Sequence, residues 1–228
     1  MAIAHIAGIN GGGSTGFTTS GIDTTGATLL IATISRYSGG GSNPCTITDS
    51  KGNTWTPMTG WTSSGTFDTM QAWFSIPTSV GSGHTITITK GAGANPFAGG
   101  GFAAFSGSKA TSVLDLEVQL NNAGASTTQT ATSITPSEAN CLIVQMLGTD
   151  GANYSSINAG YTLSFKQDWS GGAYVTSALA YLIQTTAAAS APTITIDASA
   201  GVGIGTASFK ALAAATSQIK TWDGVANT

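Results

Sequence analysis

The stretch Thr85-Ile86-Thr87-Ile88-Thr89 alternates strictly between threonine and isoleucine. Successive side chains of a β-strand point to opposite faces of a sheet, so this pattern places both isoleucines on one face and the threonines on the other. The stretch Thr193-Ile194-Thr195-Ile196 repeats the pattern in the second half of the chain. A half-buried strand of this kind is typical of a β-sandwich, and its recurrence predicts two related halves.

Other segments rich in Thr, Ile, Val and aromatic residues also predict strands, with turn residues between them. In the first half they cover residues 28–35, 45–48, 53–58, 70–76, 84–90 and 101–105. In the second half they cover residues 141–147, 161–166, 174–183, 193–197 and 204–210. Helical patterns are too short to count. We therefore expect an all-β fold, an antiparallel β-sandwich of jelly-roll-like type, formed by internal duplication.

An alignment of the two halves supports the duplication. Trp73 precedes Tyr181 by the same interval that separates the two alternating stretches, so an aromatic strand and the alternating strand align without a gap. The expected organisation is an irregular N-terminal arm (1–27), a first β half (28–107), a linker (108–136), a second β half (137–212) and a C-terminal tail (213–228). Residues 121–133 are expected to form an exposed crossing, and the glycine-rich residues 201–205 a hairpin turn.

The charge content excludes several classes of partner. Only 7% of the residues are Asp, Glu, Lys or Arg, against about 25% in an ordinary soluble domain. A formal net charge of -3 provides no basic patch for phosphates, so neither nucleic acid nor an anionic membrane is an expected partner. Lysine usually protects sheet edges from pairing with other chains. With so few charges the edges need other cover, which favours a component of an assembly.

Residues suited to chemistry or targeting are sparse. Nothing links His5 or His84 to a nucleophile and an acid, and no His/Cys cluster has metal-ligand spacing, so we expect no catalytic site, cofactor or metal. Cys45 and Cys141 could be buried thiols or a disulfide. Residues 1–9 do not resemble a signal peptide, and no segment approaches the roughly 20 apolar residues of a membrane span.

Several motifs resemble β-sandwich modules of bacteriophage virion proteins and of some bacterial surface or secreted proteins. They include Ile22-Asp23-Thr24-Thr25-Gly26-Ala27, Thr48-Asp49-Ser50-Lys51-Gly52-Asn53-Thr54-Trp55, Ala72-Trp73-Phe74 and Phe102-Ala103-Ala104-Phe105-Ser106-Gly107. The C-terminal Ile219-Lys220-Thr221-Trp222-Asp223-Gly224-Val225-Ala226 is similar to short units that end many phage structural proteins. These motifs are signatures of strands and turns and carry over no catalytic residue.

The resemblance implies a non-enzymatic structural protein on the virion, as a capsid decoration or on the tail or a fibre. We expect a homo-oligomer, with a trimer preferred, that contacts other virion proteins through the arm and through Ile219, Trp222 and Val225. The alternative is a carbohydrate-binding or adhesion module, either a phage receptor-binding tip or a secreted or cell-surface protein. Its flat rings would stack on a host-surface glycan; the candidates are Trp55, Trp61, Tyr154 and Trp169.

Overall fold

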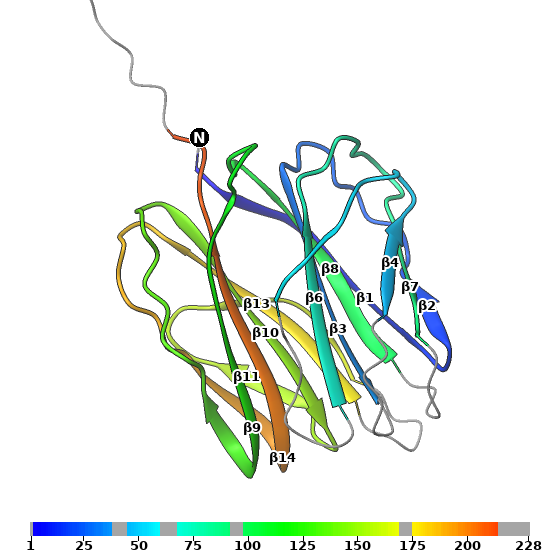
Figure 1. Ribbon diagram of the computed structural model, residues 1–228, viewed down its shortest axis with the longest axis vertical. Coiled ribbons are helices and arrows are strands. Elements are labelled where there is room, and N and C mark those ends of the chain that lie inside the picture. Colours follow the sequence, from blue (N-terminus) through cyan, green and yellow to red (C-terminus); the bar gives the residue numbers. More distant parts are fainter. Residues whose placement is uncertain (1, 38–44, 60–67, 92–97, 169–174, 214–228) are drawn as a thin grey trace, which may run out of the picture.

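The computed structural model describes residues 2–37, 45–59, 68–91, 98–168 and 175–213. Within these ranges all regular structure is β-strand, and every pairing between strands is antiparallel. The strands form three sheets (Figure 1). The predicted all-β, antiparallel fold is therefore confirmed.

The first half contains two sheets. Its strands are β1 (Ala4–Gly13), β2 (Gly16–Thr18), β3 (Leu29–Tyr37), β4 (Thr46–Asp49), β5 (Thr56–Pro57), β6 (Asp68–Ser75), β7 (Ile86–Thr89) and β8 (Ala98–Ser106). A five-stranded sheet has the order β1-β8-β3-β6-β5, and a three-stranded sheet has the order β2-β7-β4. The three-stranded sheet covers one face of the five-stranded sheet, since buried side chains of both sheets pack in one cluster.

The second half is built from six strands. They are β9 (Leu114–Thr130), β10 (Cys141–Asp150), β11 (Tyr154–Ile157), β12 (Thr162–Gln167), β13 (Val175–Gln184) and β14 (Thr193–Phe209). The sheet order is β11-β14-β10-β13-β12, and β9 also pairs with β14. The first residues of β14 pair with β11 and the end of β9, whereas its last eight residues pair with β10 and the start of β9.

The same order of pairing occurs in both halves. The inner strands run β1-β8-β3-β6-β5 in the first half, and β9-β14-β10-β13-β12 in the second. The outer strands run β2-β7-β4 and, from the end of β9 and the start of β14, β9-β14-β11. The registers also agree, because Leu29 lies opposite Phe105 as Leu142 lies opposite Phe209. In the second half β9 thus takes the places of both β1 and β2, and β14 those of both β8 and β7.

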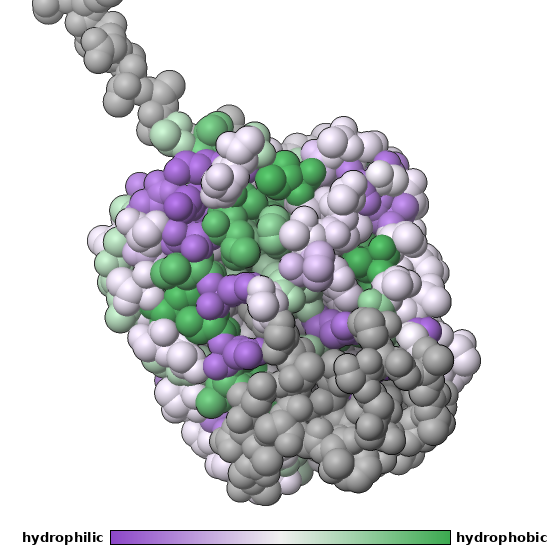
Figure 2. Space-filling view, viewed as in Figure 1, coloured by the Kyte–Doolittle hydropathy of each residue, from purple (hydrophilic) through white to green (hydrophobic). Residues whose placement is uncertain are grey.

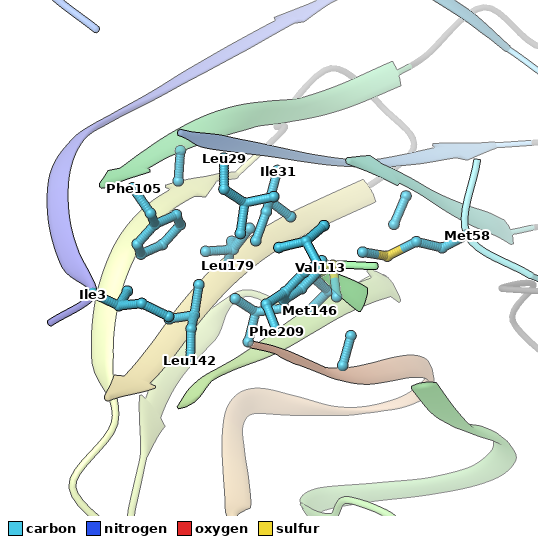
Figure 3. Packing of buried hydrophobic residues seen from close by; sticks show 14 of the residues in the cluster. Ile3, Leu29, Ile31, Met58, Phe105, Val113, Leu142, Met146, Leu179 and Phe209 are labelled. Atoms are coloured by element: carbon cyan, nitrogen blue, oxygen red, sulfur yellow. The ribbon is translucent and has the colours of Figure 1, made fainter. Parts of the chain in front are cut away.

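The largest core lies between the inner sheets of the two halves. Leu29, Ile31 and Phe105 from the first half face Leu142 and Phe209 from the second, and all five are fully buried (Figure 3). Both faces of these sheets are covered, since each also carries an outer layer. This arrangement explains why β3 and β10 begin with unbroken apolar runs instead of an alternating pattern.

Each half has a second core between its inner and outer strands. Ile86 and Ile88 pack in that of the first half, and Ile194 and Ile196 in that of the second. All four side chains are at most 2% exposed. The alternating stretches therefore point their isoleucines inward, as their period predicts.

Three predictions about connecting segments are wrong. Residues 1–27 are not an irregular arm, since β1 is hydrogen-bonded along β8 and β2 along β7. Residues 121–130 of the expected linker belong to β9, and residues 201–205 continue β14 instead of turning. Each segment contains several Gly, Ala or Asn residues, which are depleted in strands. Pairing with a long neighbour overrides that propensity.

The ungapped alignment of Trp73 with Tyr181 is also wrong. Trp73 lies opposite Ala32 and packs in the core beneath the outer sheet. Tyr181 lies opposite Val144 and packs against the central core. A shift of one residue moves a side chain to the other face of a sheet. By register, Phe74 is the residue that matches Tyr181.

Candidate functional site

The partner contacts expected from the tail cannot be placed. Ile219, Trp222 and Val225 lie outside the described residues. Two of the aromatic residues expected to stack on glycans, Trp61 and Trp169, also lie outside them. Only Trp55 and Tyr154 of the expected sites have a described environment.

Tyr154 is not available to a sugar. Its ring is 7% exposed and packs in the outer core of the second half, where the residue lies opposite Ile196 on β14. Burial raises the pKa of its hydroxyl to about 12. The expectation that Tyr154 stacks on a glycan is therefore wrong, because the inward face of β11 carries the ring into the core.

Trp55 is half-buried and fixed by the fold. Its Nε1 donates a hydrogen bond to Asp49 Oδ2 (2.9 Å), and its ring packs against a small cluster that contains Leu30 and Ala104. An indole held in this way stabilises the turn in which it lies. Its orientation is set by Asp49 and the cluster rather than by a ligand.

Asp49 is the centre of a buried network of hydrogen bonds. Its Oδ1 accepts from the backbone N–H of Lys51 (2.9 Å) and of Asn53 (3.1 Å). Its Oδ2 accepts from Asn53 Nδ2 (3.1 Å) in addition to Trp55. Burial raises the pKa of this carboxyl, but the hydrogen bonds outweigh it and hold the pKa below its ordinary value. Gly52, with φ of 73°, permits the tight turn.

Asn53 extends the network to the loop before β7. Its Oδ1 accepts from the backbone N–H groups of Thr78 (2.9 Å) and Ser79 (3.0 Å), and its Nδ2 donates to the carbonyl of Ser79 (2.9 Å). Lys51 Nζ donates to the carbonyl of Ser82 (3.0 Å). The motif from Thr48 to Trp55 therefore has a structural role, because it binds the main chain of a second loop.

Thr24, His84 and Asp49 form a chain of hydroxyl, imidazole and carboxylate. Thr24 Oγ1 lies 2.8 Å from His84 Nδ1, and His84 Nε2 lies 3.4 Å from Asp49 Oδ2. This order resembles a nucleophile, a base and its orienting acid. Thr24 and His84 are 0% exposed, however, so a substrate has no access to the hydroxyl. We therefore assign these residues to the fold. Nothing in the sequence joined them, because they meet only when three loops close.

A second polar network secures the segment between the halves. The side chain of Asp115 is 3% exposed and accepts from Ser137 and Ser208, with Lys210 Nζ at 3.2 Å. Lys109 Nζ lies 2.6 Å from Glu138 Oε1. These contacts attach both ends of the expected linker to the end of β14, so the charges serve local structure.

The outer strands of both halves present a row of hydroxyl groups. Thr18, Thr87 and Thr48 lie side by side on β2, β7 and β4. Thr128, Thr195 and Ser156 do so on β9, β14 and β11. Figure 2 shows many residues of near-neutral hydropathy on the described part of one face, with apolar and hydrophilic patches among them. These rows offer hydroxyl groups rather than charges to a partner.

Comparison with protein-family models finds no match for this chain, and neither do comparisons with curated proteins and with solved structures. Among the described residues, no group of three His, Cys, Asp or Glu side chains could hold a metal ion. The same residues include no helix able to cross a membrane.

The two cysteines are free and buried. Burial raises the pKa of both thiols, that of Cys141 to about 11. In the native protein at pH 8 we expect Cys141 to react with a thiol reagent about a hundredfold more slowly than in the unfolded chain, because little thiolate is present. The measurement is a timed reaction with 5,5′-dithiobis(2-nitrobenzoic acid), with and without denaturant. Fast labelling of both thiols without denaturant would contradict this burial.

Proposed function

We propose that this protein is a non-enzymatic structural protein on the outside of a bacteriophage particle, as a capsid decoration or on the tail or a fibre. The observation that carries the proposal is the use of its buried polar residues. Asp49, Asn53, His84 and Asp115 all bind other parts of the chain. Such a molecule is built to hold a shape and present a surface.

The order of the strands supports a more specific architecture. A jelly roll pairs its first strand with its eighth, its eighth with its third and its third with its sixth, and β1-β8-β3-β6 follows this order. The outer β2-β7-β4 follows the second jelly-roll sheet over three strands, whereas β5 departs from that order because it pairs with β6 instead of β4. We propose that each half is a jelly roll and that the pair arose by duplication. Viral capsid and lectin domains use this fold, which is support by analogy of fold alone.

Two strands at the edges of the inner sheets, β1 and β12, contact each other within the chain. β1 and β12 lie side by side, with Asn10 Nδ2 donating to the carbonyl of Lys166 (2.6 Å) and His5 bonded to Ser164 (2.8 Å). Two edges thus cover each other within one chain, which removes part of the need for a partner. Assembly now rests on the uncharged outer faces and on the apolar residues of the tail.

The proposed assembly is a homo-oligomer, with a trimer as the expected symmetry, bound to other virion proteins. The test deletes residues 214–228 and follows mass by light scattering and binding to particles that lack the protein. We expect the deletion to lower association or particle binding. Unchanged mass and binding would contradict a role for the tail, and a full-length chain that stays monomeric without particle affinity would contradict the structural proposal. Deleting residues 1–20 would not test assembly, because it removes β1 and β2.

Carbohydrate binding is the second candidate function, and one observation favours it. The strands that follow the segments containing Trp61 and Trp169, β6 and β13, begin at the same end of the two halves. A Cβ built on Gly99, near the start of β8, would lie 3.0 Å from Gln167 at the end of β12. Tyr37 pairs with Asp68 at that same end.

The test is a glycan array with the wild type and with Trp61→Ala and Trp169→Ala. The matched control is Trp55→Phe, which keeps a ring in the half-buried site. Loss of a glycan signal in the first two variants alone would support this function, and no signal with the wild type would exclude it for the glycans on the array.

A further inference from the structure

The two halves share a small structural device that differs in one residue. In the first half Ile22 and His84 exchange two backbone hydrogen bonds, of 3.0 and 2.9 Å. In the second half Ile134 and Ser190 do the same, at 3.0 and 2.8 Å. Each bridge fastens the segment before the central strand, β3 or β10, to the segment before the alternating strand. We call each bridge, together with the side chains that bond beside it, a fastener. The two fasteners occupy matching places in the halves, but different side chains are bonded in them.

The fastener of the first half closes on an imidazole. His84 is 0% exposed; its Nδ1 is hydrogen-bonded to Thr24, whereas its Nε2 lies 3.4 Å from Asp49 Oδ2 without a hydrogen bond. The described charged groups that face it are Asp49, the last residue of β4, and Lys51 in the turn that follows, and β8 contributes only the ring of Phe102 at 5.4 Å. Burial lowers the pKa of His84, and the carboxylate of Asp49, which raises it, does not offset this effect. The neutral imidazole is therefore the form that fits.

The fastener of the second half closes on two hydroxyl groups. Tyr161 Oη lies 2.9 Å from Ser190 Oγ, and both residues are buried. Burial raises the pKa of Tyr161 to about 12. Neither hydroxyl changes its charge between pH 5 and 8, so mild acid leaves this fastener unaltered.

We propose that Thr24, His84 and Asp49 form an acid-sensitive latch, so that mild acid opens the first half of the molecule locally while the second half stays closed. Opening of the latch frees the segment 22–27 from the loop 78–84, to which Thr24 binds through the backbone N–H of Gly81. It also loosens that loop from the turn after β4, to which Asn53 binds it. The apolar cluster of Ala27, Leu30 and Ala104 lies beneath Trp55 and Val80 at this end. Acid would therefore uncover an apolar surface on one half alone.

The sign of the effect follows from the lowered pKa. In the open state His84 returns to an ordinary pKa of about 6.5, whereas in the closed state its pKa is lower. Below about pH 6.5 the open state binds the proton and the closed state does not, so acid favours opening. The opening equilibrium should rise by up to about tenfold per pH unit until the closed-state pKa is reached.

The test is amide hydrogen exchange followed by NMR from pH 7.5 to pH 5, expressed as protection factors. The amides of Ile22 and His84 report on the latch, and those of Ile134 and Ser190 are an internal control. We expect protection of the first pair to fall by up to about tenfold per pH unit below about pH 6.5, with the second pair unchanged. Equal behaviour of the two pairs would overturn the proposal.

Two variants assign the effect to His84. His84→Gln should remove the pH dependence, whereas His5→Gln should keep it, although burial lowers the pKa of His5 as well. Should His84→Gln fail to fold, the titration of His84 in His5→Gln decides the question, since it is then the one histidine in the chain. A pKa of 6.5 or above in the folded protein would overturn the latch. Neither outcome depends on the proposed place of the protein on a virion.

Discussion

Replacing Phe209 by alanine is expected to lower the free energy of unfolding by about 3–5 kcal/mol. Phe209 is fully buried in the core between the two halves and lies 5.8 Å from the ring of Phe74. Removal of the ring leaves a cavity bounded by strands of both inner sheets, which cannot close without moving a whole sheet. Phe105→Ala should cost a similar amount, because Phe105 occupies the matching place opposite Leu29.

The measurement is equilibrium unfolding in guanidinium chloride, monitored by fluorescence and by circular dichroism. Leu212→Ala is the control, since Leu212 is 48% exposed and its loss should change stability by no more than about 0.5 kcal/mol. The shared core also predicts that both probes report a single transition, shifted as a whole by Phe209→Ala. Two separate transitions, of which only one moves, would contradict a core common to both halves.

Replacing Asp49 by alanine is expected to cost about 3 kcal/mol or more, because several buried donors lose their acceptor at once. The backbone N–H groups of Lys51 and Asn53, Asn53 Nδ2 and Trp55 Nε1 all donate to this carboxylate. Its side chain and that of His84 are fully buried, so water replaces these bonds only if the turn opens. Unsatisfied buried donors are among the few causes of large mutational losses.

The measurement is again denaturant unfolding, monitored by circular dichroism and by tryptophan fluorescence, to which Trp55 contributes as one of five tryptophans. Asp23→Ala is the matched control: Asp23 is exposed and accepts only from the backbone N–H and hydroxyl of Thr25. Asp23→Ala should lower the free energy of unfolding much less than Asp49→Ala does. The free energy of unfolding of Asp49→Asn, which keeps one acceptor oxygen, should lie between those of the two alanine variants. Equal stabilities of the two alanine variants would show that the Asp49 network does not stabilise the turn.

The sequence predicted most strands where the alternation or the apolar run is strong. Residues 70–76, 141–147 and 174–183 correspond to β6, β10 and β13, with ends that differ by at most three residues. The strands missed were those rich in glycine or small polar residues, such as β1 and the continuation of β14. Their local signals favour turns, and only the neighbouring strands supply the hydrogen bonds that extend them. Gly101 illustrates the reason, because an added Cβ would collide with the carbonyl oxygen of Ile9 on β1.

The candidate sites depended even more on tertiary structure. Tyr154 and Trp55 carry the same aromatic signal, yet one lies inside a core and the other is held by Asp49. The sequence marked residues 48–55 as a signature of strands and turns, but it did not show that β4 and β5 lie in different sheets or which loop the turn between them binds. The exposure of a ring depends on which face of a strand meets the next layer, and a single residue of register decides that face.

The sequence by itself determined the class of fold and the inward direction of Ile86, Ile88, Ile194 and Ile196, because strand formation and a period of two are local properties. The tertiary structure alone decided that the two inner sheets pack against each other and that Thr24, Asp49 and His84 meet. These contacts join residues 25 to more than 100 positions apart. Their formation depends on how the closed chain excludes water from both faces of the inner sheets, and no short segment of sequence contains that information.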